Sequence, residues 1–242
     1  MRPVDLPVLV VIPALNEEES VADVVRDVRA ACPMADCLVI DDGSADLTGA
    51  RARAAGADVL RLPFNMGVGG AMRAGYRFAQ KHGYGVVVQV DGDGQHDTAT
   101  ISELVDGLFE ADLVIGARFA GKGDYGVHGP RRWAMRLLSL VGSRVARVRL
   151  TDVTSGFKAA GPRAIDLFAE EFPAEYLGDT VEALVIASRA GLRVQQVPVA
   201  MRPRQAGEPS HGPIKAAVYL VRACVAFGLA MLRPRVNPGR AA

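Results

Sequence analysis

The chain has 242 residues, half of them hydrophobic, and its 28 basic and 27 acidic residues leave a net charge of +1. This is enough apolar material for one α/β domain, whereas two domains would be crowded. The balanced charge forces no strongly basic face, so we expect no nucleic-acid partner. Three cysteines without metal-ligand spacing favour reduced thiols in a cytoplasmic protein. We expect neither a secretory signal nor a transmembrane helix.

Short apolar runs alternate with helical patterns along the first half of the chain. We predict strands over 8–12, 37–40, 59–62, 86–90 and 113–115, and helices over 21–28, 46–55 and 101–109. A glycine-rich turn over 65–70 leads into a further helix that runs to about residue 81. The continuous apolar runs suit strands that are buried on both faces. This alternation predicts a mostly parallel sheet with helices on both faces.

Polar clusters follow three of the predicted strands, after Ile12, Ile40 and Val90. In open parallel sheets, ligands bind beyond the carboxyl ends of the strands. Three clusters at three strand ends therefore predict one ligand site at this edge.

The strongest local signal is the set Asp91, Asp93 and Gln95. In an extended segment alternate side chains point the same way, so two carboxylates and an amide oxygen would face one spot. Such oxygens suit Mg²⁺ or Mn²⁺, which would neutralise a departing nucleotide diphosphate. The alternative is a polar turn that uses Asp and Gly for its backbone conformation. The buried strand before it and the other clusters favour the metal.

Two further stretches point to the same edge. Asp41 and Asp42, read with Asn16 and Glu17, suit hydrogen-bond acceptors for a base and ribose, or caps of a helix or turn. The glycines over 67–70 do not form a dinucleotide fingerprint, because the third glycine is absent. They allow a tight helix start near the ligand, or close helix–strand packing.

The second half of the chain is less regular. We predict a basic helix over 131–147, loops over 152–158 and 202–213, helices over 179–190 and 214–232, and a strand over 194–199. The last helix carries its cations on one face and apolar residues around the rest, which is typical of a helix in a membrane interface. Packing on the domain's own core or on a partner is the alternative. We therefore divide the chain into a catalytic domain, 1–212, and an interfacial helix with its tail, 213–242.

The ordered motifs resemble those of glycosyltransferase family 2, in its dolichyl-phosphate mannose synthase and polyprenyl-phosphate glycosyltransferase branch. The resemblance covers about residues 8–212 and is carried by Pro13-Ala14-Leu15-Asn16-Glu17, Asp41-Asp42-Gly43-Ser44, Asn65-Met66-Gly67-Val68-Gly69, Asp91-Gly92-Asp93-Gly94-Gln95-His96, Gly116-Ala117-Arg118 and Asp152-Val153-Thr154-Ser155-Gly156-Phe157. It implies a GT-A fold with a Rossmann-like nucleotide-binding half.

The resemblance also assigns roles to residues of this sequence. The donor-binding residues it implies are Pro13, Leu15, Asn16, Glu17, Asp42, Gly69 and Asp91. The metal ligands it implies are Asp91, Asp93 and Gln95. The catalytic residues it implies are Asp93, the phosphate-holding Arg118 and Arg131, Ser155 beside the acceptor phosphate, and Arg204 in a loop that closes over the donor.

Two departures from the branch pattern matter. Asp97 stands where a proline usually follows the Gln-His pair, and this carboxylate either supports the metal or caps the next helix. In the late loop Pro209 is an extra residue and His211 replaces a lysine. The closing cation would then titrate near neutral pH.

The resemblance implies an inverting, divalent-metal-dependent transfer of a hexose from GDP-mannose or UDP-glucose to a polyprenyl or dolichyl phosphate. We expect it at the cytoplasmic face of the membrane, with a separate membrane protein as a further partner. An acceptor phosphate is already anionic, so Asp179 or Glu182 would serve as a base only for a hydroxyl acceptor. The alternatives are a transferase of the same fold with a soluble hydroxyl acceptor, or a non-catalytic nucleotide-sugar-binding module.

Overall fold

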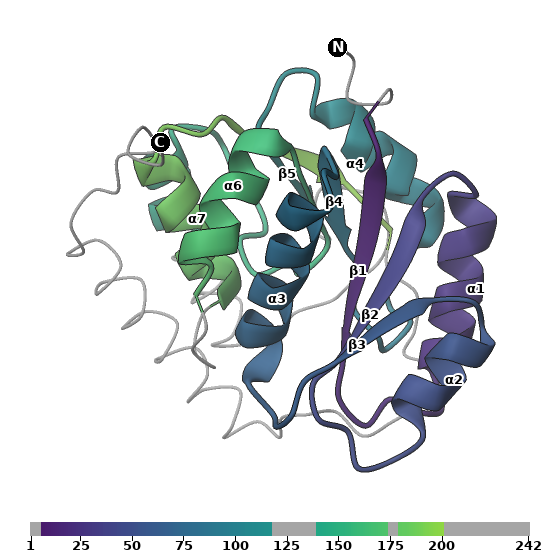
Figure 1. The fold of residues 1–242 in the computed structure, drawn as a ribbon. Helices are drawn as coiled ribbons and strands as arrows, with labels where there is room; N and C mark the ends of the chain where they lie inside the picture. The colour runs from purple at the N-terminus through teal and green to yellow at the C-terminus, as the bar shows by residue number, and fades with distance from the viewer. Residues whose placement is uncertain (1–5, 118–138, 174–178, 201–242) are drawn as a thin grey trace, which may run out of the picture.

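The computed structural model describes residues 6–117, 139–173 and 179–200 (Figure 1). The strands are β1 (Val8–Ala14), β2 (Asp36–Asp41), β3 (Asp58–Arg61), β4 (Val86–Gln89), β5 (Leu113–Ala117), β6 (Lys158–Ala160) and β7 (Val194–Pro198). The helices are α1 (Val21–Ala31), α2 (Thr48–Ala54), α3 (Gly67–Lys81), the 3-10 helix η2 (Thr98–Thr100), α4 (Ile101–Gly107), α6 (Pro162–Glu171) and α7 (Asp179–Arg189). Residues 139–146 are also helical.

The strands form one sheet in the order β3-β2-β1-β4-β6-β5-β7. β1 pairs in parallel with β2 and β4, β2 with β3, and β5 with β7. β6 is antiparallel to both of its neighbours, β4 and β5, so these two run in the same direction. The prediction of a mostly parallel sheet is therefore confirmed, with β6 as the reversed strand.

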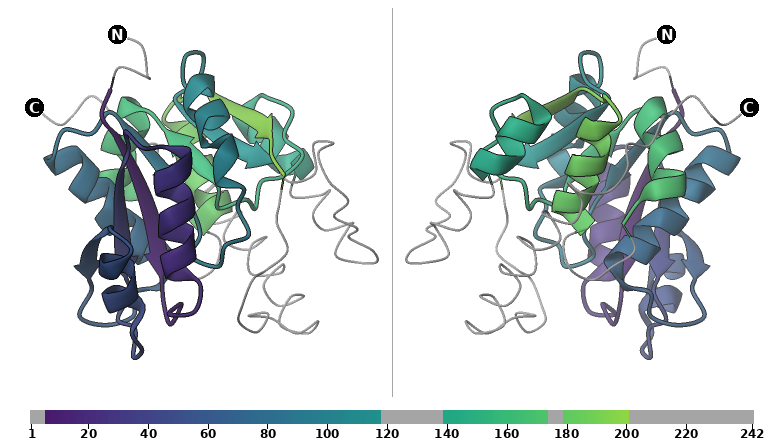
Figure 2. Two further views of the ribbon diagram at one scale, coloured as in Figure 1. Left: turned by 90° about the vertical axis from the view of Figure 1, so that its right-hand side faces the viewer. Right: turned by 90° about the vertical axis from the view of Figure 1, so that its left-hand side faces the viewer.

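Helices cover both faces of this sheet, as predicted (Figures 1 and 2). Alternate side chains of β1 enter opposite cores, since Leu9 and Val11 face the α3, α6 and α7 side and Val10 and Ile12 the α1 and α4 side. The apolar positions of α1, spaced as one helical face, are buried against the second core. A strand whose side chains are buried on both faces explains the continuous apolar run.

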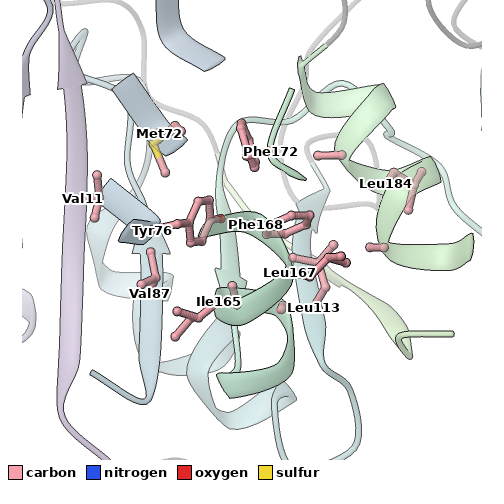
Figure 3. Close-up of a cluster of buried hydrophobic side chains, with 14 of the residues drawn as sticks. Val11, Met72, Tyr76, Val87, Leu113, Ile165, Leu167, Phe168, Phe172 and Leu184 are labelled. Atoms are coloured by element: carbon pink, nitrogen blue, oxygen red, sulfur yellow. The ribbon is translucent and has the colours of Figure 1, made fainter. Parts of the chain in front are cut away.

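The larger core is built around three aromatic rings (Figure 3). The ring of Tyr76 on α3 lies 5.1 Å from that of Phe168 and 5.2 Å from that of Phe172. Burial raises the pKa of the Tyr76 hydroxyl. A Cβ on Gly75 would lie 2.7 Å from Val11 Cγ1, so the absent side chain lets α3 pack directly on β1. This close packing holds the start of α3 at the carboxyl edge of the sheet.

The second half differs from the sequence-based expectation in two elements, β6 and α6, that were not predicted. Lys158 was placed at the end of a loop but begins β6, which inserts between β4 and β5. A strand of three residues has too little pattern to recognise, and α6 follows it directly with Pro162 in its first turn. The expected loop over 202–213, the helix over 214–232 and residues 131–138 of the expected basic helix lie outside the described residues, whereas the helix expected to end at 147 is confirmed over 139–146.

Two other expectations concern thiols and membrane helices. Cys32 and Cys37 are free thiols, whereas Cys224 lies outside the described residues. Burial is the main cause that raises the pKa of the Cys37 thiol, to about 12. Among the helices within 6–117, 139–173 and 179–200, none is both long and apolar enough to span a bilayer.

Candidate functional site

The polar segments after β1, β2 and β4 lie side by side at the carboxyl edge of the sheet, as predicted. The backbone N–H of Asp42 donates to the carbonyl of Ala14 over 2.9 Å, which joins the ends of β2 and β1. The Ser20 hydroxyl donates to the carbonyl of Gly92 over 2.8 Å, which ties the start of α1 to the segment after β4. Segments distant in sequence therefore meet at one candidate site.

The segment 91–96 is a tight turn, so the expectation of an extended segment is wrong. Gly92 and Asp93 lie in the turn, and Gly94 has a φ of 74°, in the left-handed region that glycine favours. The Asp93 carboxylate accepts a hydrogen bond from the N–H of Gln95 over 3.1 Å. Asp91, Asp93 and Gln95 remain partly exposed within this turn. The three residues therefore share a turn rather than one face of a strand.

Two side chains fix the direction of the Asp91 carboxylate. The Gln89 amide donates to Oδ1 over 3.2 Å, from the last residue of β4. His96 Nδ1 accepts the backbone N–H of Asp91 over 3.1 Å, and His96 Nε2 lies 3.5 Å from Asp91 Oδ2. Because Nδ1 is an acceptor, we assign the proton of the neutral ring to Nε2, facing the carboxylate.

The loop before β6 packs against this carboxylate from another direction. A Cβ on Gly156 would lie 2.8 Å from Asp91 Oδ2 and 2.9 Å from Oδ1. The Phe157 ring stacks on that of His96, with centroids 4.7 Å apart and an interplanar angle of 14°. Ser155 is buried, and its hydroxyl accepts the N–H of Phe157 over 3.3 Å. The serine that the resemblance assigns to the acceptor thus takes part in the loop's own structure.

The acidic pair after β2 is bound to the protein backbone. Asp41 accepts the N–H of Ser44 over 2.9 Å, and Asp42 accepts that of Met66 over 2.7 Å. Burial is the main cause that raises the pKa of Asp42; hydrogen bonds from Met66 and Gly67 oppose it, and the charge of Asp41 adds to it. Both carboxylates act as caps of a turn or helix start, as the alternative interpretation had it. The donor-binding role of Asp42 stays a prediction.

The turn after β1 is bound to the loop after β2. Asn16 has a φ of 54°, its N–H donates to the Ser44 hydroxyl over 3.0 Å, and its side-chain oxygen accepts the N–H of Ala45. The Glu17 N–H donates to the Thr48 hydroxyl over 2.9 Å. Of the other predicted donor-binding residues, Pro13 and Leu15 are partly exposed at this strand end, and Gly69 is buried in the first turn of α3.

Three predicted catalytic residues, Arg118, Arg131 and Arg204, lie outside the described residues, as does His211. Asp97 caps the 3-10 helix η2 by accepting the N–H of Ala99 over 3.4 Å, in line with the cap alternative. Within the part of the chain that the structure describes, no three His, Cys, Asp or Glu side chains gather as a metal cage.

Sequence reasoning assigned no role to Gln89, His96 or Gly156, although all three surround Asp91. A glutamine ending a run of buried valines is a usable signal, because a buried amide needs a polar partner. His96 and Gly156 lay within quoted motifs, but only the folded chain places them against the carboxylate.

Known proteins resemble this chain along most of its length. The family model described as Glycosyl transferase family 2 matches residues 9–166. Undecaprenyl-phosphate mannosyltransferase of Micrococcus luteus is 37% identical over 213 residues, covering 83% of this chain and 86% of that protein. Polyprenol monophosphomannose synthase of Mycolicibacterium smegmatis is 33% identical over 231 residues, covering 88% and 84%.

A similar solved structure is glucosyl-3-phosphoglycerate synthase from Mycobacterium tuberculosis, in complex with Mn²⁺, UDP-glucose and phosphoglyceric acid. Its TM-score is 0.74 at 22% identity, with 96% of this chain and 82% of that chain covered. At this identity the likeness speaks for the fold alone. The mostly parallel seven-stranded sheet is thus a GT-A-like fold.

Proposed function

Because this chain belongs to glycosyl transferase family 2, and so is a glycosyltransferase, we propose that it moves a hexose from a nucleoside diphosphate sugar to a polyprenyl phosphate. The observation that carries the proposal is the convergence of three polar segments at the carboxyl edge of the sheet, with Asp91 partly exposed there. Two bacterial relatives support this acceptor by their names, undecaprenyl-phosphate mannosyltransferase and polyprenol monophosphomannose synthase.

The donor lies over the ends of β1 and β2. Pro13, Leu15, Asn16 and Glu17 surround the nucleoside, with Asp42 below them. Hydrogen bonds accepted by Asn16 and Asp42 hold these loops in place, so the donor would bind to loops that are already ordered. Loops that are already ordered lose less conformational entropy when the ligand binds.

Asp91, Asp93 and Gln95 would hold a divalent cation, Mg²⁺ or Mn²⁺. The residues fit such an ion, because two partly exposed carboxylates in one turn keep free lone pairs after their internal hydrogen bonds. Two carboxylates with phosphate oxygens are a usual Mg²⁺ shell, so no cage of three protein anions is needed. When bound, such an ion would neutralise the negative charge on the leaving nucleoside diphosphate.

The transfer inverts the anomeric carbon, because the acceptor phosphate displaces the nucleotide directly. This acceptor is ionised at neutral pH and needs no strong general base. The chain therefore contributes mainly by positioning the substrates and by neutralising charge. Arg118 and Arg131 hold phosphate groups, Arg204 belongs to a loop that closes over the donor, and the loop with Ser155 borders the acceptor.

We place the enzyme at the cytoplasmic face of the membrane, where a polyprenyl phosphate is anchored. The amphipathic pattern over 214–232 supports contact with the lipid surface, alone or through a separate membrane protein.

The test is a transfer assay with the whole chain. GDP-mannose and UDP-glucose, each radiolabelled, are offered with liposomes that contain undecaprenyl phosphate or with soluble 3-phosphoglycerate, in Mn²⁺, Mg²⁺ or EDTA. We expect label in the lipid fraction with one donor only, abolished by EDTA. Label in 3-phosphoglycerate alone would favour the soluble acceptor, and binding of a donor with no transfer to either would favour a non-catalytic module.

A further inference from the structure

The Asp91 carboxylate is held from several sides by residues that have no part in the function proposed so far. We propose that His96, Phe157 and Gly156 form a clamp that fixes this carboxylate and couples the loop 151–157 to the cation site. His96 is then a positioning residue that acts through Asp91. This inference rests on the proposed function, because it concerns the cation that Asp91 binds.

The His96 ring can hold Asp91 because its own orientation is fixed. The ring is buried, with 4% of its side chain exposed, whereas 38% of the Asp91 side chain is exposed. One ring nitrogen accepts the Asp91 N–H and the other faces the Asp91 carboxylate. The ring of Phe157 lies nearly parallel to it and prevents it from tilting. A hydrogen-bonded residue behind a metal ligand sets that ligand's direction and basicity.

Gly156 completes the clamp because it has no side chain. Its φ lies outside the left-handed region, so an alanine here meets no backbone strain. The added Cβ would instead lie 2.8 Å from a carboxylate oxygen, far inside contact distance. Glycine is therefore needed for space, since it allows the loop backbone to press on Asp91.

The loop 151–157 is itself tied to the second half of the sheet. The Gln196 side chain of β7 accepts the N–H of Thr151 over 2.7 Å and donates to the carbonyl of Asp152 over 2.6 Å. The Gly116 N–H of β5 donates to the carbonyl of Phe157 over 2.8 Å. A shift of this loop therefore reaches Asp91 through Gly156 and the stacked rings. These contacts connect the loop that borders the acceptor directly to Asp91.

The experiment measures the affinity of each protein for Mn²⁺, once in the presence of GDP and once in the presence of UDP. Four variants are compared with the wild type and with a matched control. Free Mn²⁺ is followed by electron paramagnetic resonance, and the affinity of each nucleotide without metal is measured in parallel. The variants are His96→Asn, His96→Gln, Phe157→Leu and Gly156→Ala. Gly161→Ala is the control. Gly161 lies at the end of the sheet opposite to the candidate site, and its added Cβ would make only an ordinary contact, 3.5 Å from the nearest atom.

Loss of a partner behind a metal ligand typically lowers metal affinity by about 10- to 100-fold. We expect that loss for His96→Asn and Gly156→Ala, a smaller one for Phe157→Leu, and little change in nucleotide affinity without metal. His96→Gln should recover part of the affinity, because its amide can place a donor near the original Nε2. Gly161→Ala should behave as the wild type.

Wild-type Mn²⁺ affinity in His96→Asn and Gly156→Ala would overturn the clamp while leaving the proposed function intact. Equal losses of metal-dependent and metal-free nucleotide affinity would also overturn it, because that result indicates a general structural role. If His96→Asn does not fold, Gly156→Ala and Phe157→Leu decide by the same criteria. Failure of the wild type itself to bind Mn²⁺ with either nucleotide would overturn the proposed function.

Discussion

Two acidic turns flank β1 at the carboxyl edge of the sheet, one after β2 and one after β4, and they serve different ends. Asp41 and Asp42 are almost fully buried, and their carboxylates accept backbone N–H groups. Asp91 and Asp93 stay partly exposed, with lone pairs directed away from their internal hydrogen bonds. The carboxylates of the first turn thus stabilise the loops that would border the donor, whereas those of the second turn remain accessible to a cation.

In each turn one aspartate is contacted by a glycine from another segment, and the two contacts have different consequences. A Cβ on Gly49 would lie 2.8 Å from Asp41 Oδ2, and a Cβ on Gly156 would lie 2.8 Å from Asp91 Oδ2. Gly49 belongs to α2, so its contact fixes a helix against a buried carboxylate. Gly156 belongs to the loop before β6, so its contact fixes a carboxylate that can still reach a ligand. The close contact therefore stabilises the fold at Gly49, whereas at Gly156 it positions a carboxylate for a ligand.

The largest effect that separates the two turns is expected from Asp91→Asn. The variant keeps the shape of the side chain but loses the charge that would bind the cation. We expect kcat to fall by about 10²- to 10³-fold, as for other lost electrostatic contacts to a transition state. Initial rates and thermal midpoints check this, and the midpoint should stay near that of the wild type. Full activity in Asp91→Asn would remove the distinction between the turns.

A smaller effect, on stability rather than rate, is expected from Asp41→Ala. The substitution leaves the buried N–H of Ser44 without its acceptor, which costs about 1–3 kcal/mol in the free energy of unfolding. Urea denaturation measures this loss, and Asp41→Asn, which keeps an acceptor oxygen, should lose less. Unchanged stability together with lost donor binding would show that Asp41 resembles Asp91 after all.

The smallest effect is a change in the pH dependence of stability in Asp42→Asn. Burial raises the folded-state pKa of Asp42 above the ordinary value of 3.8, so folding favours the protonated form. The stability that this group contributes is complete below pH 3.8 and is lost as the pH rises through its raised pKa. The asparagine side chain of the variant cannot ionise, so the wild type should lose stability relative to the variant across that interval. Urea unfolding of both proteins at successive pH values checks the sign, and a relative gain by the wild type would contradict it.

The sequence predicted the first half of the fold well, and in the second half it predicted α7 and β7 but missed β6 and α6. The elements up to β5 follow the expected order, because long apolar runs and helical spacing are local signals. β6 was missed because three residues carry no periodicity, and its place between β4 and β5 depends on pairing with distant residues. The alternation expected for 91–95 failed because Gly92 and Gly94 turn the chain at the end of β4.

By itself, the sequence determined the parallel α/β architecture, the edge of the sheet at which the polar segments meet and the family to which the chain belongs. These follow from residue types and their order along the chain. Only the tertiary structure decided which aspartates are buried and bound to backbone N–H groups and which stay partly exposed. It also decided that His96 and Gly156 contact Asp91. Burial and hydrogen-bond partners depend on segments far apart in sequence, so two acidic turns that look alike as strings of residues become different sites once the chain folds.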